Sequence, residues 1–196
     1  MLSVCKVLCG FDYVIEGEEN IPDEPSVILI KHTTVFEAYA QLDIFPPQTW
    51  VVKRELLWIP FFGWGLAAMR PIAIDRKAGH RSVNQVIEQG KERLSRGIWL
   101  TVFPEGTRMS LGKTRRYGVS GAALAKAAQC KIVPVAHNAG DFWPRRGFKK
   151  EPGIIRFCIG PPIGPSDRPA KEINLEVQDW IETKMLEISR GYQNES

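Results

Sequence analysis

Short apolar segments alternate with helical segments along this chain, and this alternation constrains the fold more than any other feature. The segments of strand length and apolar character are 13–15, 27–30, 50–52, 72–74, 98–103, 132–135 and 154–159. The segments predicted to be helical are 36–42, 83–94, 118–129 and 173–188. Strands that alternate with helices in this way predict an α/β fold whose central sheet is mainly parallel and flanked by helices.

The chain of 196 residues is long enough for one sizeable core, and we predict a single domain over residues 1–196. No internal repeat, low-complexity tract or linker divides it. Hydrophobic residues make up 44% and charged residues 24% of the chain, which is typical of a globular protein and excludes intrinsic disorder. Residues 171–190, approximately, are predicted to form a C-terminal amphipathic helix.

The net charge of +4 is small, but the basic side chains fall into two clusters. The members of these clusters are Arg108, Lys113, Arg115 and Arg116 in the first and Arg145, Arg146, Lys149 and Lys150 in the second. Such clusters suit an anionic partner such as a phosphate, an acidic lipid surface or nucleic acid. A solvated basic loop is the alternative explanation for either cluster alone.

No apolar segment reaches the ~18 residues that a membrane-spanning helix needs. The segment before residue 9 is too short for a secretory signal. We therefore expect a peripheral protein, or one anchored by a segment outside this sequence. Cys5, Cys9, Cys130 and Cys158 lack paired metal-ligand spacing, and they are predicted to be reduced thiols without a zinc site or disulfides.

The first motif with chemical meaning is Lys31-His32-Thr33-Thr34-Val35-Phe36-Glu37, which comes directly after the apolar segment 27–30. A strand that ends near His32, followed by a turn and a helix that begins near Glu37, would bring an imidazole and a carboxylate together. His32 is then a candidate general base, and Glu37 would orient its ring and stabilise the imidazolium. A capping box, with Thr34 as N-cap and Glu37 three residues later, is the alternative explanation.

The second motif, Phe103-Pro104-Glu105-Gly106-Thr107-Arg108, ends the predicted strand 98–103. Pro104 ends the strand because it lacks the N–H that a central ladder needs. Gly106 lets the backbone approach a ligand closely. Arg108 offers a planar fork of donors that suits a phosphate.

Two further segments end in polar residues. In the segment Arg70-Pro71-Ile72-Ala73-Ile74-Asp75-Arg76, Arg76 is placed to meet an anionic substrate, whereas a surface ion pair with Asp75 is the alternative. Segment 132–137 is predicted to be mainly structural. His137 is a second candidate for chemistry there, although a hydrogen-bonded histidine at a strand end is the stronger interpretation.

The segment 56–66 is apolar and rich in Trp and Phe. It is too short to span a bilayer, and it fits either the buried core or a surface that faces the membrane or lines an acyl chain. Lys53 and Arg54 lie just ahead of it, and this arrangement favours the second interpretation.

The chain resembles the glycerolipid acyltransferase family, in particular its bacterial 1-acylglycerol-3-phosphate acyltransferases. The resemblance rests on four motifs in chain order: His32 with Glu37, Ile74-Asp75-Arg76, Phe103 to Arg108, and the segment 132–135. The family pattern is a histidine and an acid separated by four residues, a strand ending Ile-Asp-Arg, a Phe-Pro-Glu-Gly-Thr-Arg motif and an Ile-Val-Pro-Val strand. The resemblance covers about residues 17–164. Two positions depart from the pattern, since Glu37 stands where the family usually has Asp and Arg70 where Gly is common.

The resemblance implies a glycerol-3-phosphate acyltransferase-like fold and the transfer of a fatty acyl group to the 2-hydroxyl of lysophosphatidate, giving phosphatidate in phospholipid biosynthesis. Acyl-CoA or acyl carrier protein would be the donor. His32 and Glu37 would be catalytic. The residues expected to bind substrate are Asp75, Arg76, Glu105, Gly106, Thr107, Arg108 and Arg116, with Arg115 as an alternative to Arg116.

No metal or cofactor is expected, because a thioester is already activated and the chain shows no metal-ligand set. The expected partners are the lysophospholipid, the acyl donor and the membrane surface, on the cytoplasmic face of a bacterial inner membrane; nucleic acid is not expected. Another lyso-lipid acceptor, such as lyso-ornithine lipid, is an alternative, and so is a non-catalytic lipid-binding protein of this fold. A serine hydrolase is excluded because the chain has no Gly-x-Ser-x-Gly motif.

Overall fold

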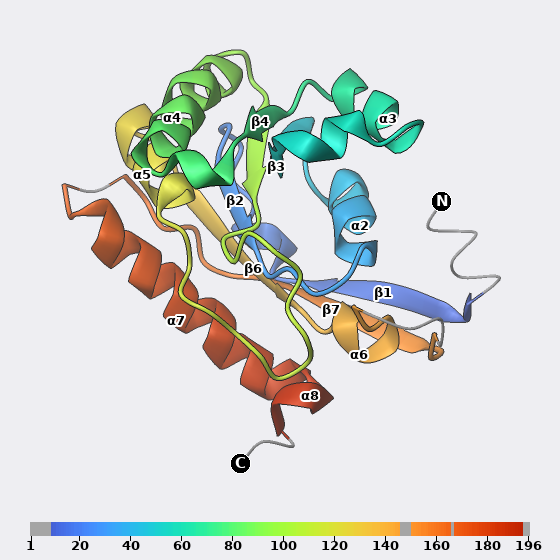
Figure 1. Cartoon of the computed structure of the whole chain (residues 1–196). Helices are drawn as coiled ribbons and strands as arrows, with labels where there is room; N and C mark the ends of the chain where they lie inside the picture. The colour runs from blue at the N-terminus through green and yellow to red at the C-terminus, as the bar shows by residue number, and fades with distance from the viewer. Residues whose placement is uncertain (1–8, 146–149, 166, 194–196) are drawn as a thin grey trace.

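The computed structural model describes residues 9–145, 150–165 and 167–193, and within them the chain forms a seven-stranded sheet with helices on both faces (Figure 1). The strands are β1 (Phe11–Glu16), β2 (Val27–Ile30), β3 (Gln48–Lys53), β4 (Ile72–Ile74), β5 (Trp99–Val102), β6 (Ile132–His137) and β7 (Gly153–Ile159). The helices are α2 (Phe36–Ile44), α3 (Phe62–Ala68), α4 (His80–Ser95), α5 (Ser120–Ala128), α6 (Ala139–Phe142), α7 (Ala170–Ile188) and α8 (Arg190–Gln193). The 3₁₀ turns are η1 (Glu18–Asn20), η2 (Arg54–Trp58) and η3 (Arg76–Ala78).

The strand order across the sheet is β1-β7-β6-β2-β5-β3-β4. Neighbouring strands are parallel except β6 and β7, which run antiparallel. The predicted α/β fold with a mainly parallel sheet is confirmed. Strand β2 lies at the centre, where Val27 pairs with Leu100 of β5 on one side and Ile132 of β6 on the other.

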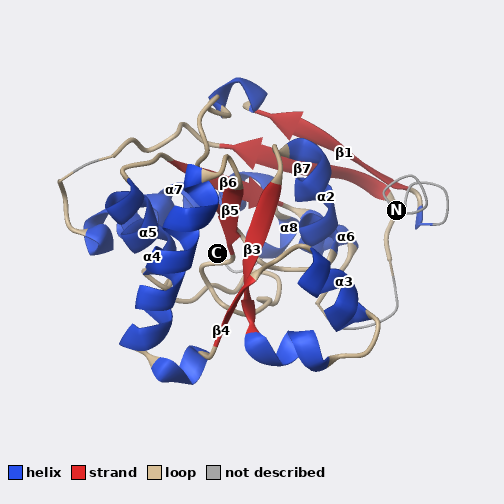
Figure 2. Cartoon of the chain, turned by 90° about the horizontal axis from the view of Figure 1, so that it is seen from above, coloured by secondary structure: helices blue, strands red, loops and turns tan. Residues whose placement is uncertain are grey.

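Helices α4, α5 and α7 cover one face of the sheet, and α2, α3 and α6 cover the other (Figures 1 and 2). Strand β2 shows why both faces are covered. Val27 and Leu29 pack into the core on the α4, α5 and α7 side, whereas Ile28 and Ile30 pack into the core that contains α2. Alternate side chains of a strand point to opposite faces, so a strand buried on both faces is apolar throughout.

Helices α3, α6 and α8 have no counterpart among the predicted helices. Helices α6 and α8 have four residues each, which is too short for a periodic pattern to show. Helix α3 lies in the aromatic segment 56–66, where Gly63 and Leu66 are buried but most of the other side chains face outward. Such a helix is mostly apolar on its exposed side, so the sequence lacks the alternation that marks an amphipathic helix.

No helix in the described part of the chain has the length and apolarity needed to cross a bilayer. Cys9, Cys130 and Cys158 are free thiols, and burial raises the pKa of Cys130 to about 11. Cys5 lies outside the described residues, as do Arg146 and Lys149 of the second basic cluster.

The carboxyl ends of β2, β4, β5 and β6 meet at one edge of the sheet because these strands run in the same direction. The chain leaves these strands at Lys31, Asp75, Phe103 and Asn138. Open α/β sheets bind their ligands at this edge.

Candidate active site

His32 and Glu37 meet directly after β2. Nδ1 of His32 lies 2.7 Å from Oε1 of Glu37, whose side chain is fully buried. The same carboxylate accepts the main-chain N–H groups of Thr33 at 3.1 Å and of Thr34 at 3.0 Å. The turn between strand and helix therefore closes around the carboxylate, and the predicted proximity of imidazole and carboxylate is present in the structure.

Only half of the capping box is present. Glu37 accepts the N–H of Thr34, but Oγ1 of Thr34 accepts the N–H of Phe36 at 2.8 Å instead of that of Glu37, and α2 begins after Val35 without a side-chain cap. These bonds satisfy donors at the helix start that have no partner inside the helix. The helix start fixes the carboxylate, and the carboxylate in turn fixes the imidazole. An acceptor on Nδ1 places the ring proton there and leaves Nε2 free to accept another.

The ring of His32 lines a cavity of about 220 Å³ at the carboxyl edge of the sheet. The side chain is 20% exposed, and the ring packs on Phe103 with centroids 4.1 Å apart. Most other walls of the cavity are apolar and come from β3, α2 and α3, whereas Arg76 and Arg108 bring positive charge. The cavity thus combines a base, cationic donors and apolar walls.

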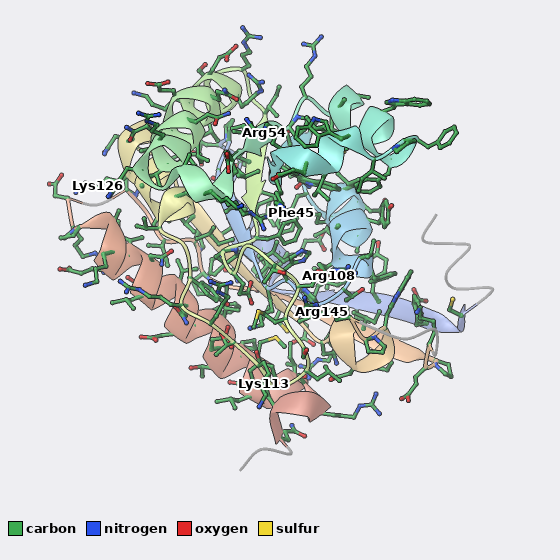
Figure 3. The ribbon with its side chains drawn as sticks, viewed as in Figure 1. Phe45, Arg54, Arg108, Lys113, Lys126 and Arg145 are labelled. Atoms are coloured by element: carbon green, nitrogen blue, oxygen red, sulfur yellow. The ribbon has the colours of Figure 1, made fainter. Side chains whose placement is uncertain are left out.

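Arg76 follows β4. Arg108 follows β5, and Figure 3 shows it near the centre of the molecule. Nη1 of Arg76 donates a hydrogen bond to the main-chain carbonyl of Gly106. Gly106 has a φ of 69°, in the left-handed region that favours glycine. Partial burial lowers the pKa of Arg76, and the nearby charge of Arg115 acts in the same direction. The structure therefore gathers several guanidinium groups near His32.

Asp75 shapes the turn that presents Arg76. Its carboxylate accepts the N–H of Lys77 at 2.9 Å and forms an ion pair with Arg54 at 3.2 Å. Asp75 does not line the cavity that contains His32. Because an anionic side chain would repel an anionic ligand at Arg76, Asp75 is better suited to fixing the turn.

Thr107 and Arg116, which were expected to bind substrate, are also absent from the walls of this cavity. Arg116 is exposed. Its neighbour Arg115 is also exposed, but its charge acts on Arg76. Of the two adjacent arginines, Arg115 is therefore the one for which the structure records an electrostatic link to the cavity.

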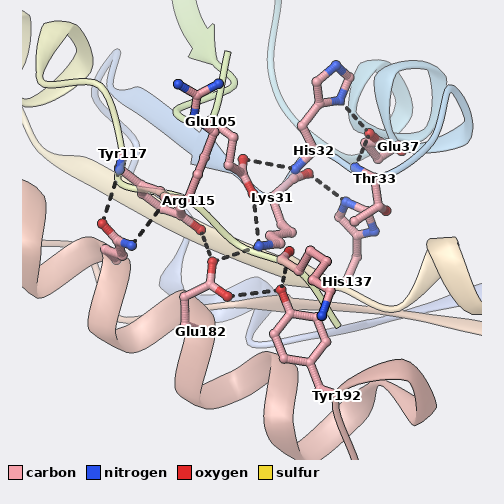
Figure 4. A network of polar contacts seen from close by, with 12 residues as sticks. Lys31, His32, Thr33, Glu37, Glu105, Arg115, Tyr117, His137, Glu182 and Tyr192 are labelled. Atoms are coloured by element: carbon pink, nitrogen blue, oxygen red, sulfur yellow. Dashed lines mark hydrogen bonds and ion pairs between the residues drawn. The ribbon is translucent and has the colours of Figure 1, made fainter. Parts of the chain in front are cut away.

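Glu105 was expected to bind substrate, but in the structure its carboxylate contacts protein groups. Its side chain is fully buried, and Oε1 lies 2.9 Å from Nζ of Lys31. Oε2 accepts the main-chain N–H of His32 at 3.2 Å (Figure 4). Burial raises the pKa of Glu105, and the charge of Lys31 opposes this rise. In this arrangement the buried carboxylate of Glu105 holds the main chain of His32 and is out of reach of a ligand in the cavity.

A second apolar cavity of about 360 Å³ adjoins the first, between α2 and α3. The walls that the two cavities share are formed by Val35, Ala38, Trp50, Phe62 and Leu66. The space beside His32 and the space between the two helices are therefore direct neighbours.

Three aromatic side chains are the most exposed of the large apolar side chains in segment 56–66. Trp58 is 69% exposed, Phe61 79% and Trp64 66%. The buried-core alternative is wrong for these residues, which form an apolar surface around the start of α3. We call Trp58, Phe61 and Trp64 the aromatic surface. Contiguous exposed apolar groups of this kind mark an interaction site on a protein surface.

Comparisons with known proteins identify the family. The Acyltransferase family model matches residues 12–138. A 1-acyl-sn-glycerol-3-phosphate acyltransferase of Pseudomonas aeruginosa is 43% identical over 187 residues, which cover 94% of this chain and 73% of that protein. This chain belongs to the Acyltransferase family.

Two more distant similarities complete the comparison for this acyltransferase. The human 1-acyl-sn-glycerol-3-phosphate acyltransferase alpha is 27% identical over 198 residues, which cover 97% of this chain and 68% of that protein. The crystal structure of the 1-acyl-sn-glycerophosphate acyltransferase from Thermotoga maritima has a TM-score of 0.78 at 23% identity, covering 94% of this chain and 75% of that one. The structural likeness shows that the two chains share the fold.

The second histidine candidate has a structural role in this acyltransferase. His137, at the end of β6, is fully buried, and its Nε2 donates to the carbonyl oxygen of Lys31 at 2.7 Å. Its Nδ1 accepts the N–H of Ala139 at 3.3 Å. Burial lowers the pKa of His137. Both ring nitrogens thus have main-chain partners, and the ring holds the residue that precedes His32.

Sequence reasoning missed a group of buried polar residues behind the acyltransferase site. Nζ of Lys31 lies between Glu105 and Glu182 of α7, and Glu182 also accepts from Tyr117 and Tyr192 (Figure 4). One signal was available in the sequence. Polar residues recur every four residues along α7 beside its apolar stripe, at the positions Asn174, Gln178 and Glu182.

Proposed function

We propose that this acyltransferase moves a fatty acyl group from a thioester donor to the 2-hydroxyl of lysophosphatidate, which gives phosphatidate. One observation carries the proposal: His32, whose Nδ1 is held by Glu37, lines the same cavity as two arginines, and this cavity shares part of its wall with a second, apolar cavity. The names of the relatives, including the protein of Pseudomonas aeruginosa that covers 94% of this chain, support the same acceptor.

In the proposed reaction, Nε2 of His32 takes the proton of the acceptor hydroxyl. The oxygen attacks the thioester carbonyl carbon and forms a tetrahedral intermediate, which collapses with loss of the thiolate. The imidazolium then returns its proton to the thiolate, so that the base is regenerated. Glu37, 2.7 Å from Nδ1, stabilises the imidazolium between these two steps. General-base assistance of this kind contributes roughly 10²–10⁴ in rate.

Arg76 and Arg108 would bind the phosphate of the acceptor. Both line the cavity beside His32, and their guanidinium groups present donors that match phosphate oxygens. The bond from Arg76 to the carbonyl of Gly106 holds its guanidinium at this edge before the ligand arrives. The distance between phosphate and hydroxyl in a lysophosphatidate is fixed by its glycerol, so a bound phosphate would align the hydroxyl with the base.

The acyl chain of the donor would lie in the apolar space between α2 and α3, next to the aromatic surface. Trp58, Phe61 and Trp64 have the exposure and chemistry of side chains that enter the headgroup region of a bilayer, and Lys53 and Arg54 precede them. We therefore propose peripheral attachment through α3 to the cytoplasmic face of a membrane. The transfer requires no metal or cofactor in this proposal, and acyl-CoA and acyl carrier protein remain the two candidate donors.

A transfer assay tests the proposal. Purified protein is mixed with labelled acyl-CoA or acyl carrier protein and with a panel of lysophospholipids, and the products are identified by mass spectrometry. Preferred acylation of lysophosphatidate is the expected result. Preference for another headgroup, or for lyso-ornithine lipid, would move the acceptor to that class. No transfer to any acceptor with either donor would favour a non-catalytic lipid-binding protein.

A further inference from the structure

A buried cluster of three charged residues lies between the end of β2 and helix α7. Nζ of Lys31 is 2.9 Å from Oε1 of Glu105 and 2.7 Å from Oε1 of Glu182 (Figure 4). The side chains of Lys31 and Glu105 are 0% exposed, and that of Glu182 is 17% exposed. Desolvating three charges has a large cost, and removing one partner leaves the others without compensation. The positions of the three groups therefore depend on one another.

This cluster reaches the main chain of the proposed catalytic histidine. Oε2 of Glu105, the oxygen that does not face Lys31, accepts the N–H of His32 at 3.2 Å. The carbonyl of Lys31 accepts from His137 on the neighbouring strand. The single peptide unit between Lys31 and His32 is thus held at both its N–H and its carbonyl by buried side chains. A shift of the Glu105 carboxylate would move the N–H of His32 with it.

Glu182 is itself fixed by two hydroxyl groups from other segments. The hydroxyl of Tyr117 lies 2.6 Å from Oε1, and that of Tyr192 lies 2.9 Å from Oε2. Burial raises the pKa of Tyr117 well above its usual value, and the charges of Glu105 and Glu182 add to the rise, so this hydroxyl remains a donor. Glu182 therefore presents its carboxylate to Lys31 in one orientation.

We propose that Glu182, on helix α7, is a positioning residue for His32 and acts through Lys31 and Glu105. The proposal rests on the proposed function, in which His32 is the base. With Glu182 present, the ammonium group of Lys31 pairs with two carboxylates, and one oxygen of Glu105 accepts the N–H of His32. Without it, Glu105 becomes the sole anionic partner of Lys31, and its second oxygen is drawn from His32 toward the ammonium group. Residue 182 lies outside the part of the chain that the family model matches, 12–138.

The test compares Glu182→Gln with the matched control Glu176→Gln. Glu176 is on the same helix, but it pairs with Arg168, and both side chains are 46% exposed. We expect Glu182→Gln to lower kcat on the order of tenfold, because small misplacements of a catalytic group have effects of this size or larger. The KM for lysophosphatidate should stay within about twofold, since the phosphate site is not altered. The control should match the parent protein in both quantities.

A spectroscopic measurement separates positioning from loss of folding. The chain has three histidines, His32, His80 and His137, so labelling with ¹⁵N-histidine gives a simple spectrum. Glu182→Gln should shift the amide and ring signals of His32 and leave those of exposed His80 in place. Melting temperatures of all variants are recorded, and kcat is measured well below the lowest of them.

The outcomes distinguish this proposal from the proposed function. An unshifted His32 signal, or an unchanged kcat in the folded Glu182→Gln protein, overturns the positioning role. If the parent protein transfers no acyl group, the proposed function fails, whereas the spectrum still shows whether Glu182 positions His32. Should the Gln variant not fold, Glu182→Asp takes its place, because it keeps the charge and falls one methylene short of Lys31. A His32 signal unshifted in that variant overturns the proposal equally.

Discussion

The carboxylate of Glu37 binds the imidazole of His32 at 2.7 Å with an oxygen that also accepts the main-chain N–H groups of Thr33 and Thr34, in the turn before α2. The turn between β2 and α2 and the proposed catalytic pair therefore share one side chain. Substitutions of Glu37 should affect both the rate of transfer and the stability of the protein. The two effects differ in their dependence on charge.

His32→Ala is expected to lower kcat by roughly 10²–10⁴, because it removes the base, with little change in melting temperature. Glu37→Asp should keep part of the activity, since the shorter side chain retains the charge. Glu37→Gln should be weaker than Glu37→Asp, because an amide does not stabilise the imidazolium. His80→Ala, at an exposed histidine, is the control. Equal rates for Glu37→Gln and the parent protein would leave the carboxylate with a capping role alone.

Arg76→Ala and Arg108→Ala are each expected to lower kcat/KM for lysophosphatidate by roughly 10–150-fold. This range corresponds to the loss of one charge-assisted hydrogen bond of about 1.5–3 kcal/mol. Arg108→Lys should recover only part of the loss, since an ammonium group makes no bidentate contact. Arg96→Ala, directly after α4, outside the cavity walls and paired with Glu92, is the control. The same steady-state kinetics are measured with an acceptor that lacks phosphate. Equal losses of kcat/KM for both acceptors would show that the two arginines have a structural role instead.

The aromatic surface is expected to bind anionic lipid vesicles. Trp58→Ala with Phe61→Ala should weaken cosedimentation by roughly tenfold or more, because a buried aromatic side chain contributes about 1.5–3 kcal/mol. Salt should weaken binding further by screening Lys53 and Arg54. The control is Leu175→Ala with Leu186→Ala, which alters two exposed leucines on α7. Vesicle binding that the aromatic substitutions leave intact would place the membrane contact elsewhere.

Ala38→Phe is expected to shift the preference toward shorter acyl chains. Ala38 lies in the wall shared by the two cavities, so a larger side chain would reduce the space available in both. Competition between donors of different chain length, read by mass spectrometry, measures the shift. Ala67→Phe, at an exposed position of α3 outside both cavities, is the control. An unchanged length preference would mean that the acyl chain lies outside this space.

His137 should make the protein less stable as the pH falls. Burial lowers its pKa in the folded state, whereas in the unfolded chain the pKa is about 6.5. Below this value the unfolded state binds a proton that the folded state does not. The free energy of unfolding therefore falls with decreasing pH, by at most about 1.4 kcal/mol per pH unit from this residue.

Urea unfolding of the parent protein and of His137→Gln measures this dependence. The measurements run from about pH 8 to about pH 5, the range in which proteins are usually most stable. The Gln variant should show a shallower decline, since its amide does not titrate. His80→Gln should keep the slope of the parent protein because His80 is exposed. Parallel curves for the parent protein and His137→Gln would contradict a depressed pKa for this residue.

The sequence was most informative where the relevant contacts are local. His32 and Glu37 are five residues apart, and a strand followed by a helix leaves few ways to arrange them. The roles of Glu105 and Lys31 depend instead on Glu182, which is 151 residues from Lys31. The motif shows that the carboxylate of Glu105 follows a strand. The direction in which this side chain points depends on the charged groups that distant parts of the chain place beside it.

The aromatic segment 56–66 shows a second limit of sequence reasoning. Its composition fits a core as well as an exposed surface, because both consist of Trp, Phe and Leu. The difference comes from backbone geometry, since Phe61 has a φ of 61° before α3 and Gly63 packs against the main chain of Leu57. These contacts turn Leu66 inward and Trp64 outward. The roles of both side chains in binding remain predictions.

The position of β2 in the sheet has a consequence for synthesis on the ribosome. Val27 pairs with Leu100 and Ile132, which lie 73 and 105 residues later in the chain. The central strand therefore has no partner until β5 emerges, and it is flanked on both sides only after β6 has followed. During this interval four consecutive apolar residues, Val27–Ile30, carry unpaired main-chain groups. The nascent chain should accordingly need a chaperone most while residues 31–135 are being added.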